Sequence, residues 1–237
     1  MTQDRTGIQL EAVRLRLGST DFTFDAQLPA GRITAIAGAS GSGKSTLLNL
    51  VAGFETPDSG RVLIDGLDMT DRHPSKRPVS LVFQDNNLFA HLDLFTNVGL
   101  GLDPTLSLDA AAKRAVSEAL SRVGLAGFER RRPPTLSGGE RQRAAFARAL
   151  VRRKPVLLLD EPFAALDPGL RSDMAKLLVS LHRETENTVL MVSHDAGEVM
   201  ALAGHILFVD AGRIVFGGTP QAFEKSEISA INRFLGA

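Results

Sequence analysis

Residues 38–45 of this 237-residue chain, GASGSGKS, follow an apolar segment at 32–38 and precede an apolar-periodic stretch that stops at Gly53. This order predicts a strand, a glycine-rich loop and a helix. Glycines let a loop wrap closely around phosphate oxygens, and a helix N-terminus adds the positive end of its dipole. The stretch therefore predicts a phosphate-binding loop, and it restricts the chain to α/β folds that can place one at the end of a strand.

The stretch also satisfies the pattern G-x-x-x-x-G-K-[ST] in the required strand and helix context. Lys44 would supply a cation to the β and γ phosphates of a nucleotide, and the Ser45 hydroxyl would bind Mg²⁺. A flexible glycine turn is the alternative, which the flanking strand and helix disfavour. The expected nucleotide-binding residues here are Gly38, Ala39, Ser40, Gly41, Ser42, Gly43, Lys44, Ser45 and Thr46.

Short apolar strands alternate with helices over the second half of the chain, with strands at 156–160 and 188–193 and a helix near 170–184. Such strands, together with 78–84, indicate a parallel sheet that is covered by helices on both faces. The carboxyl ends of parallel strands border the ligand crevice. We therefore expect the polar residues at these strand ends to converge near the phosphates.

Three such residues are Gln84, Asp160 and His194. Asp160 is expected to hold Mg²⁺, and Glu161 to polarise the water that attacks the γ phosphate. Gln84 would contact the metal and this water, and His194 the γ phosphate. Taken alone, an Asp-Glu pair is also typical of a helix N-cap and a lone histidine of a surface residue; the phosphate-binding loop favours the catalytic interpretation.

The remaining patterns complete an α/β architecture with a mostly parallel sheet. Alternating segments at 8–17 and 22–28 predict further strands, and 205–216 predicts an antiparallel hairpin that turns at 210–212. We expect one domain over 1–237. Its mostly helical insertion spans 85–135 and extends to about 153, and a short helical tail covers 219–237.

Composition disfavours nucleic acid as a partner and excludes sites that need cysteine. Lys plus Arg and Asp plus Glu are equal at 27 each, so no overall charge favours nucleic acid. The chain has no cysteine, which excludes disulfides and thiolate metal sites and fits a reducing compartment. We find no secretory signal and no apolar run of about eighteen residues that could span a membrane. Work at a membrane would therefore require separate membrane-embedded partners.

A second glycine-containing helix start lies at 135–150, TLSGGERQRAAFARAL. Ser137, Gly138 and Gly139 would begin this helix with exposed backbone N–H groups, which is a second phosphate-facing arrangement. An N-cap serine followed by glycines that permit close packing is the alternative.

The motifs LSGGE and RQR occur in one chain with the phosphate-binding loop, Gln84, VLLLDEP, the loop 164–167 and His194, in this order. This set resembles the ATP-binding cassette (ABC) ATPase family over residues 10–218. The resemblance implies a head-to-tail homodimer that binds two ATP molecules with Mg²⁺, each ATP lying between the P-loop of one subunit and the LSGGE segment of the other. It assigns contacts across that interface to Ser137, Gly138, Gly139, Glu140 and Asp167.

Three positions depart from the family pattern. Glu140 replaces a glutamine, Ala164 stands where serine is frequent, and Leu17 aligns with the aromatic residue expected to stack on adenine. Phe22 could substitute for that aromatic residue or could belong to the core.

The resemblance further implies the ATPase motor subunit of a membrane transporter, rather than a soluble family member that acts on nucleic acid or ribosomes. Two permease domains would dock near Gln84 to Phe95, with a periplasmic solute-binding protein as an indirect partner. The chain would lie peripherally on the cytoplasmic face of the bacterial inner membrane. Four apolar residues of this segment could form the docking site or the core of the helical insertion: Leu88, Phe89, Leu92 and Phe95.

The segments RPVSLVFQDNNLFAHL, at 77–92, and NVGLGL, at 97–102, are similar to the ATP-binding subunits of bacterial thiamine importers. Thiamine is therefore the expected cargo. Import of iron, polyamine or molybdate is the alternative.

Overall fold

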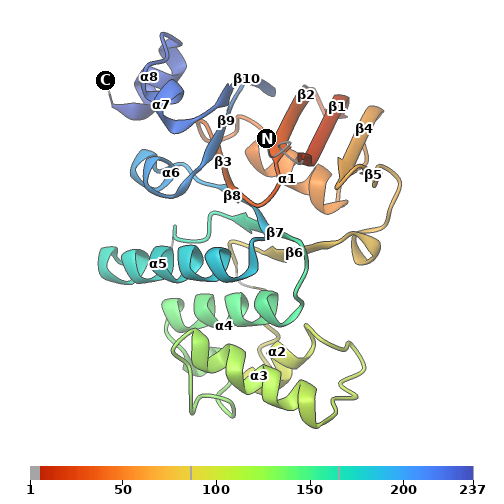
Figure 1. Cartoon of the computed structure of the whole chain (residues 1–237), viewed down its shortest axis with the longest axis vertical. Helices are drawn as coiled ribbons and strands as arrows, with labels where there is room; N and C mark the ends of the chain where they lie inside the picture. The colour runs from red at the N-terminus through yellow and green to blue at the C-terminus, as the bar shows by residue number, and fades with distance from the viewer. Residues whose placement is uncertain (1–5, 86, 165, 237) are drawn as a thin grey trace.

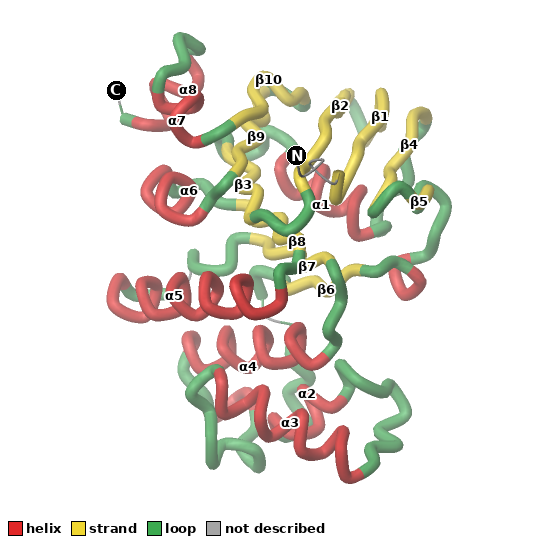
Figure 2. Tube along the Cα trace, viewed as in Figure 1, coloured by secondary structure: helices red, strands yellow, loops and turns green. Residues whose placement is uncertain are grey.

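The computed structural model describes residues 6–85, 87–164 and 166–236. Its strands form one sheet in the order β5-β4-β1-β2-β10-β9-β3-β8-β7-β6, and helices lie on both sides of it (Figures 1 and 2). The strands are β1 (Thr6–Leu17), β2 (Thr20–Pro29), β3 (Ile33–Ala37), β4 (Ser59–Ile64), β5 (Leu67–Asp68), β6 (Val79–Val82), β7 (Val156–Asp160), β8 (Thr188–Val192), β9 (His205–Asp210) and β10 (Arg213–Gly218).

The helices follow the expected α/β pattern. They are α1 (Lys44–Ala52), α2 (Leu94–Gly99), α3 (Ala110–Arg122), α4 (Gly138–Val151), α5 (Pro168–Thr185), α6 (Ala196–Leu202), α7 (Pro220–Glu224) and α8 (Ser229–Leu235). Short 3₁₀ turns lie at Pro74–Lys76 and Pro133–Thr135. Most α-helices begin at a side-chain cap, as where Asp109 accepts a hydrogen bond at the start of α3 and Asp195 does so at α6.

The sheet has a parallel half and an antiparallel half. Strands β9, β3, β8, β7 and β6 are parallel, and all residues of β3 and β8 are buried, as expected for strands covered on both faces. Strands β2, β1, β4 and β5 are antiparallel. The two halves meet where β10 pairs in parallel with β2, at Arg213 and Thr23. The expected antiparallel element is thus continuous with the main sheet.

The predicted hairpin at 205–216 is confirmed. Asp210 pairs with Arg213, which leaves Ala211 and Gly212 as a two-residue turn with φ of 44° and 77°. Positive φ at both central residues is the geometry that matches the twist of antiparallel strands.

Two hydrophobic clusters occupy the two faces of the sheet. One involves the sheet and helices α2 to α8, and it includes Phe146, Phe163 and Met174. The other fills the space around α1 and includes Leu47, Leu50 and Phe24. Helices α2, α3 and α4 pack on one another in the lower half of Figure 1, away from α1.

The strand predicted at 78–84 is shorter than expected, because β6 ends at Val82. Phe83 leaves the strand and its ring lies 5.8 Å from that of Phe54. The chain therefore leaves the sheet before Gln84.

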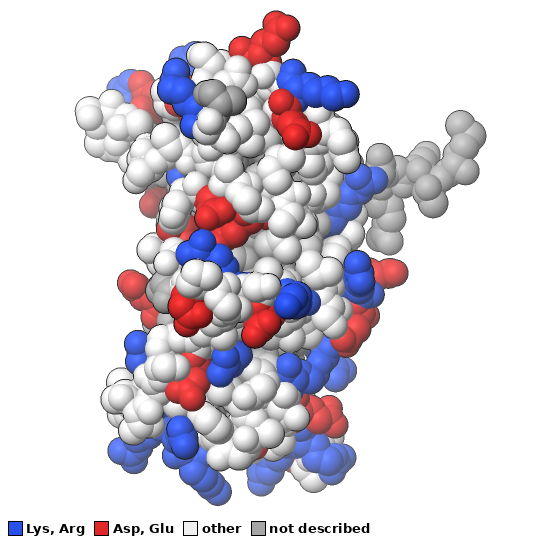
Figure 3. Space-filling model, turned by 90° about the vertical axis from the view of Figure 1, so that its left-hand side faces the viewer, with Lys and Arg blue, Asp and Glu red and all other residues white. Residues whose placement is uncertain are grey.

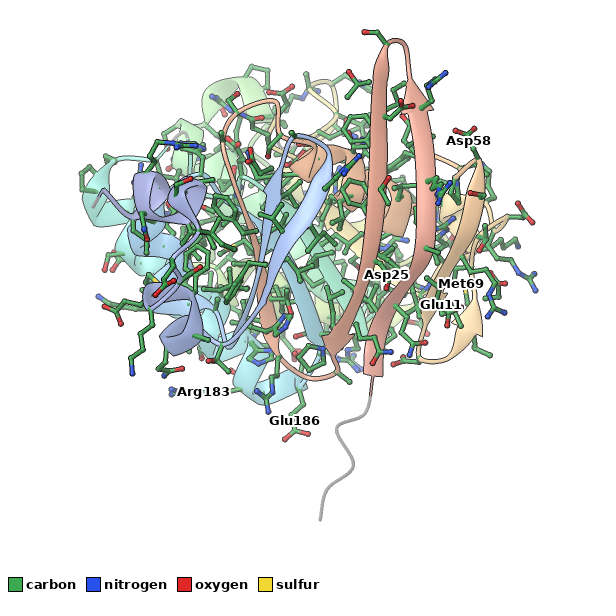
Figure 4. All side chains as sticks on the ribbon, turned by 90° about the horizontal axis from the view of Figure 1, so that it is seen from above. Glu11, Asp25, Asp58, Met69, Arg183 and Glu186 are labelled. Carbon is green, nitrogen blue, oxygen red and sulfur yellow. The ribbon has the colours of Figure 1, made fainter. Side chains whose placement is uncertain are left out.

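Among the described residues, no helix is both long and apolar enough to cross a bilayer. On the face shown in Figure 3, acidic and basic side chains are interspersed with uncharged ones over most of the surface. Figure 4 places Glu11, Asp25 and Asp58 along the antiparallel strands and the segment before β4, whereas Arg183 and Glu186 lie at the opposite side, near the C-terminal end of α5.

Candidate functional site

The loop between β3 and α1 is closed by its own lysine. Lys44 is 6% exposed, and its Nζ donates hydrogen bonds to the carbonyl oxygens of Gly38 at 3.0 Å and Ala39 at 2.7 Å. Burial lowers the pKa of the Lys44 ammonium, and the carboxylates of Glu161 and Asp160 act in the opposite direction. The loop thus wraps around a partly desolvated cation, as expected for a phosphate-binding loop.

Glycines are required at two positions of this loop by close packing. A Cβ on Gly38, whose φ is 147°, would overlap the carbonyl oxygen of Val209. A Cβ on Gly43, whose φ is 109°, would lie 2.8 Å from the ring of Phe22. The loop therefore lies directly against β9 and the β1–β2 hairpin.

The same contact decides the role of Phe22. This residue is 7% exposed, belongs to the core around α1, and has its ring centroid 6.0 Å from that of Phe24. Phe22 is therefore a core residue. Leu17, at the end of β1, is 37% exposed.

Carboxylates from the end of β7 face the loop. Asp160 is the last residue of the strand, and its Oδ1 accepts a hydrogen bond from Ser45 Oγ at 3.4 Å. Burial raises the pKa of the Asp160 carboxyl, and the neighbouring charge of Glu161 raises it further. A hydroxyl and a carboxylate are thus together beside the Lys44 loop, and both are ligands that Mg²⁺ prefers.

Glu161 has a positive φ of 45°, which is uncommon for a residue with a side chain. Its backbone N–H donates to the carbonyl of Val192 on β8 at 3.2 Å. Its carboxylate Oε2 lies 3.2 Å from Nδ1 of His194, which follows β8 and has a side chain that is 58% exposed. Strained backbone conformations of this kind are found preferentially at functional sites.

The predicted convergence is therefore observed for Lys44, Ser45, Asp160, Glu161 and His194, which α1 and the ends of β7 and β8 bring together. Gln84 lies two residues beyond Val82, at the same edge of the sheet, because Val82 pairs with Leu159. Its side chain is exposed and makes no hydrogen bond within the part of the chain that the structure describes.

The start of α4 forms a capping box. Ser137 Oγ accepts from the Glu140 backbone N–H at 3.2 Å, and Glu140 Oε2 accepts from the Ser137 N–H at 2.7 Å. The hydrogen bond from the Ser137 backbone is the largest cause that lowers the pKa of Glu140, and the Ser137 side chain lowers it further. The N-cap alternative for Ser137 is thus observed, and it leaves the exposed Ser137 hydroxyl free to donate.

The two glycines that follow have different surroundings. A Cβ on Gly139 would overlap the Leu170 side chain, whereas a Cβ on Gly138 would have only the Arg141 guanidinium at 4.0 Å. Asp167, predicted to reach a second subunit, caps α5 by accepting from the Leu170 N–H at 3.0 Å. The loop residue Ala165 lies outside the described residues.

Comparison with known proteins agrees with this geometry. A family model described as ABC transporter matches residues 22–164. The chain belongs to the ABC transporter family. The resemblance drawn from the motifs is confirmed. Of the residues in those motifs, Lys44, Ser45, Asp160, Glu161 and His194 lie together at one sheet edge.

Among relatives in this family, "Thiamine import ATP-binding protein ThiQ" of Rhizobium meliloti (strain 1021) is 57% identical over 232 residues, covering 98% of both chains. The protein of the same name from Chelativorans sp. (strain BNC1) is 54% identical and covers 92% of this chain and 89% of its own.

Solved structures agree as well. The dimeric structure of a post-hydrolysis state of the ATP-binding cassette MJ0796, bound to ADP and Pi, is 29% identical with a TM-score of 0.78, and the match covers 90% of this chain and 98% of that one. A nucleotide-free ATP-binding cassette from an ABC transporter, at 22% identity and a TM-score of 0.86 over 98% of this chain and 100% of its own, supports the fold.

Sequence reasoning missed two parts of this ABC cassette. One is a set of ion pairs behind His194, made by Arg171 with Asp195 and Glu198. The other is Arg77, 1% exposed, whose guanidinium donates to the carbonyls of Leu50 and Val51 at the end of α1. No local pattern marks either set, because the partners are far apart in the sequence.

Proposed function

We propose that this chain is the ATP-hydrolysing motor subunit of a bacterial thiamine importer. The observation that carries the proposal is the convergence of Lys44, Ser45, Asp160, Glu161 and His194 at one sheet edge. The name shared by its relatives, which cover nearly the whole chain at up to 57% identity, supports thiamine as the cargo. The similarity of 77–92 and 97–102 to such importers points to the same cargo.

The loop residues bind the phosphates of ATP. Lys44 exchanges its two backbone carbonyl partners for β and γ phosphate oxygens, which are stronger partners for an ammonium. The backbone N–H groups of Gly43, Lys44 and Ser45 add hydrogen bonds at the start of α1. A partly buried lysine and uncapped N–H groups fit an anion of this kind.

The residues that would hold Mg²⁺ are Ser45, Asp160 and Gln84. The ion, when bound, neutralises charge on the β and γ phosphates. The Ser45 hydroxyl and the Asp160 carboxylate already lie in contact, so this donor set fits a small hard cation.

Glu161 orients the attacking water and accepts its proton as a general base. His194, which lies beside the Glu161 carboxylate, contacts the γ phosphate. The 3.2 Å contact between His194 Nδ1 and Glu161 Oε2 supports this pairing. The unusual φ of Glu161 holds its carboxylate at the end of β7.

We propose that two copies close head to tail on two ATP molecules. Within one chain, α4 lies in the lower half of Figure 1, apart from α1, so the start of α4 does not reach its own phosphate loop. Ser137 is exposed, and the surface beside Gly138 is open. A second subunit can therefore use the Ser137 hydroxyl and the Gly138 N–H as a second set of donors, with Glu140 and Asp167 beside them.

A groove of about 430 Å³ is proposed as the permease docking site. Its apolar lining includes Phe54 and Phe89, which are 52% and 47% exposed. Residues at the C-terminal end of α4, Arg148 and Arg152, line it as well. Leu88 and Phe95 instead pack against the core, so only part of the segment from Gln84 to Phe95 faces a partner.

The groove lies at the C-terminal ends of the two helices whose N-terminal ends are proposed to bind phosphate. Helix α1 begins at Lys44 and ends at Ala52 in the groove. Helix α4 begins beside Ser137, and Arg148 in its last turn lines the groove. A permease helix docked here would contact both helices. We accordingly place the chain as a peripheral subunit on the cytoplasmic face of the inner membrane.

The test is Glu161→Gln in the full-length chain. The variant keeps every phosphate contact but lacks the base, so ATP should convert it from monomer to dimer, measured by size-exclusion chromatography with light scattering. A variant that stays monomeric at saturating ATP would argue against the shared nucleotide. Cargo is tested by uptake of labelled thiamine in a deletion strain: wild type should restore it and Glu161→Gln should not, with labelled iron, polyamine and molybdate as comparison substrates.

A further inference from the structure

Arg171 lies in the first turn of α5 and faces two carboxylates at the start of α6. Its Nη1 donates to Asp195 Oδ2 at 3.2 Å, and its Nε lies 3.5 Å from Glu198 Oε1. The Glu198 side chain is 12% exposed. Burial raises the pKa of the Glu198 carboxyl, and the charge of Arg171 acts in the opposite direction.

The two carboxylates hold the residues on either side of His194. Glu198 Oε2 accepts from Ser193 Oγ at 2.6 Å, and Ser193 Oγ accepts from the Asp195 N–H at 3.1 Å. Asp195 Oδ1 in turn caps α6 at the Glu198 N–H, at 2.9 Å. The backbone on both sides of His194 is thus fixed, while its own side chain is exposed.

The backbone of Arg171 is linked to the start of α4 through its neighbour in sequence. It follows Leu170, which packs directly against Gly139. Its backbone N–H donates to the Asp167 carbonyl at 2.9 Å. A shift of α4 and the Asp167 loop would therefore be transmitted to Arg171 through packed groups.

We propose that Arg171 is a positioning residue that sets the place of His194 through Asp195 and Glu198, and links it to the packing of α5 against Gly139. The proposal rests on the role of His194 given under the proposed function. The Arg171 Nε is buried and makes no hydrogen bond among the described residues, so the contact with Glu198 has room to tighten when the start of α4 moves.

The experiment is a double-mutant cycle on the full-length chain, with steady-state ATPase rates as the readout. Arg171→Ala should lower kcat roughly tenfold and change KM less than twofold, because it misplaces a catalytic contact without touching the phosphate loop. Arg171→Lys should recover part of the loss, since one ammonium can reach one of the two carboxylates.

In a His194→Ala background, Arg171→Ala should lower the residual rate less than twofold, because the group that it positions is absent. Arg183→Ala is the matched control: this exposed arginine lies at the other end of the same helix (Figure 4) and should leave kcat unchanged. Thermal unfolding of each variant detects a folding defect, and Arg171→Gln, which keeps the packing of the side chain, replaces Arg171→Ala if that variant does not fold.

Equal losses from Arg171→Ala with and without His194 would overturn the proposal and indicate a general structural role. Full activity in Arg171→Ala would overturn it as well, while the proposed function stands. Full activity in His194→Ala would overturn both this proposal and the role assigned to His194.

Discussion

Helices α1 and α4 both begin next to glycines, but their first turns differ in what satisfies the backbone N–H groups. Helix α1 has Gly43 at its N-cap with no side-chain hydrogen bond and no acidic residue in its first turn. Helix α4 has a closed capping box between Ser137 and Glu140. The first start is therefore open to an external anion, and the second is stabilised by its own side chains.

This difference suggests a division of labour. The open start at α1 depends on Lys44 to hold the loop, since the ammonium bonds to its own loop carbonyls. The start at α4 keeps its shape without a nucleotide, because a capping box satisfies two N–H groups internally. One site thus binds the phosphates and the other is a preformed surface that a phosphate can meet.

The largest effect is expected at the open start. Lys44→Ala should lower ATP hydrolysis at least about a hundredfold, because it removes a charged donor from the phosphates. Phosphate release measures the rate, and Lys225→Ala, an exposed lysine after α7, is the control. Hydrolysis within threefold of wild type would show that the loop binds phosphate without its lysine.

Alanine substitutions of the two glycines at the start of α4 test how that helix start is packed. Gly139→Ala should destabilise the fold by about 1–3 kcal/mol, because its methyl group would overlap Leu170. Gly138→Ala should change the free energy of unfolding by less than about 0.5 kcal/mol, because its Cβ meets open space. Urea unfolding measures both.

Gly138→Ala should still weaken ATP-dependent dimerisation when combined with Glu161→Gln, because its methyl group points to the surface proposed for the second subunit. Equal unfolding midpoints for both alanine variants would contradict the difference in packing.

A smaller effect is expected for the carboxylate beside the open start. Asp160→Asn should stabilise the chain without nucleotide by about 1 kcal/mol at neutral pH, since burial and Glu161 disfavour the charged form. The folded pKa of Asp160 is raised, so folding loses stability as pH rises through it. The advantage of Asn should therefore shrink as pH falls and disappear well below about 3.9, the ordinary aspartate value, where Asp160 is neutral in both states.

Mg²⁺ and ATP should stabilise wild type but should no longer stabilise Asp160→Asn. Thermal unfolding of both proteins with and without ligand measures this difference. An unliganded Asp160→Asn variant less stable than wild type at pH 7 would contradict the expected sign.

The smallest effect concerns the charge of the capping box. Glu140→Gln keeps a side-chain oxygen for the Ser137 N–H but removes a negative charge from the helix start, which should lower stability by about 0.3–0.5 kcal/mol. The same change should tighten ATP-dependent dimerisation of the Glu161→Gln variant roughly twofold, because it removes a carboxylate that would face phosphates. Weaker dimerisation would show that the Glu140 charge is favourable in the closed pair.

Local patterns were sufficient for the parts of this protein that depend on neighbours in sequence. The order of apolar strands, Gly38 to Ser45 and the polar residues at strand ends predicted the α/β fold and the meeting of Lys44, Asp160 and His194, because parallel strands end at one edge. The hairpin at 205–216 was predicted for the same reason.

Contacts between distant segments decided the rest. The burial of Phe22 under Gly43, the end of β6 at Val82 and the groove beside Phe54 depend on packing that no single segment encodes. The positive φ of Glu161 and the pairing of Arg171 with Asp195 and Glu198 likewise require neighbouring strands and helices to be in place. Propensity and periodicity act over a few residues, whereas these features arise from close packing across the whole fold.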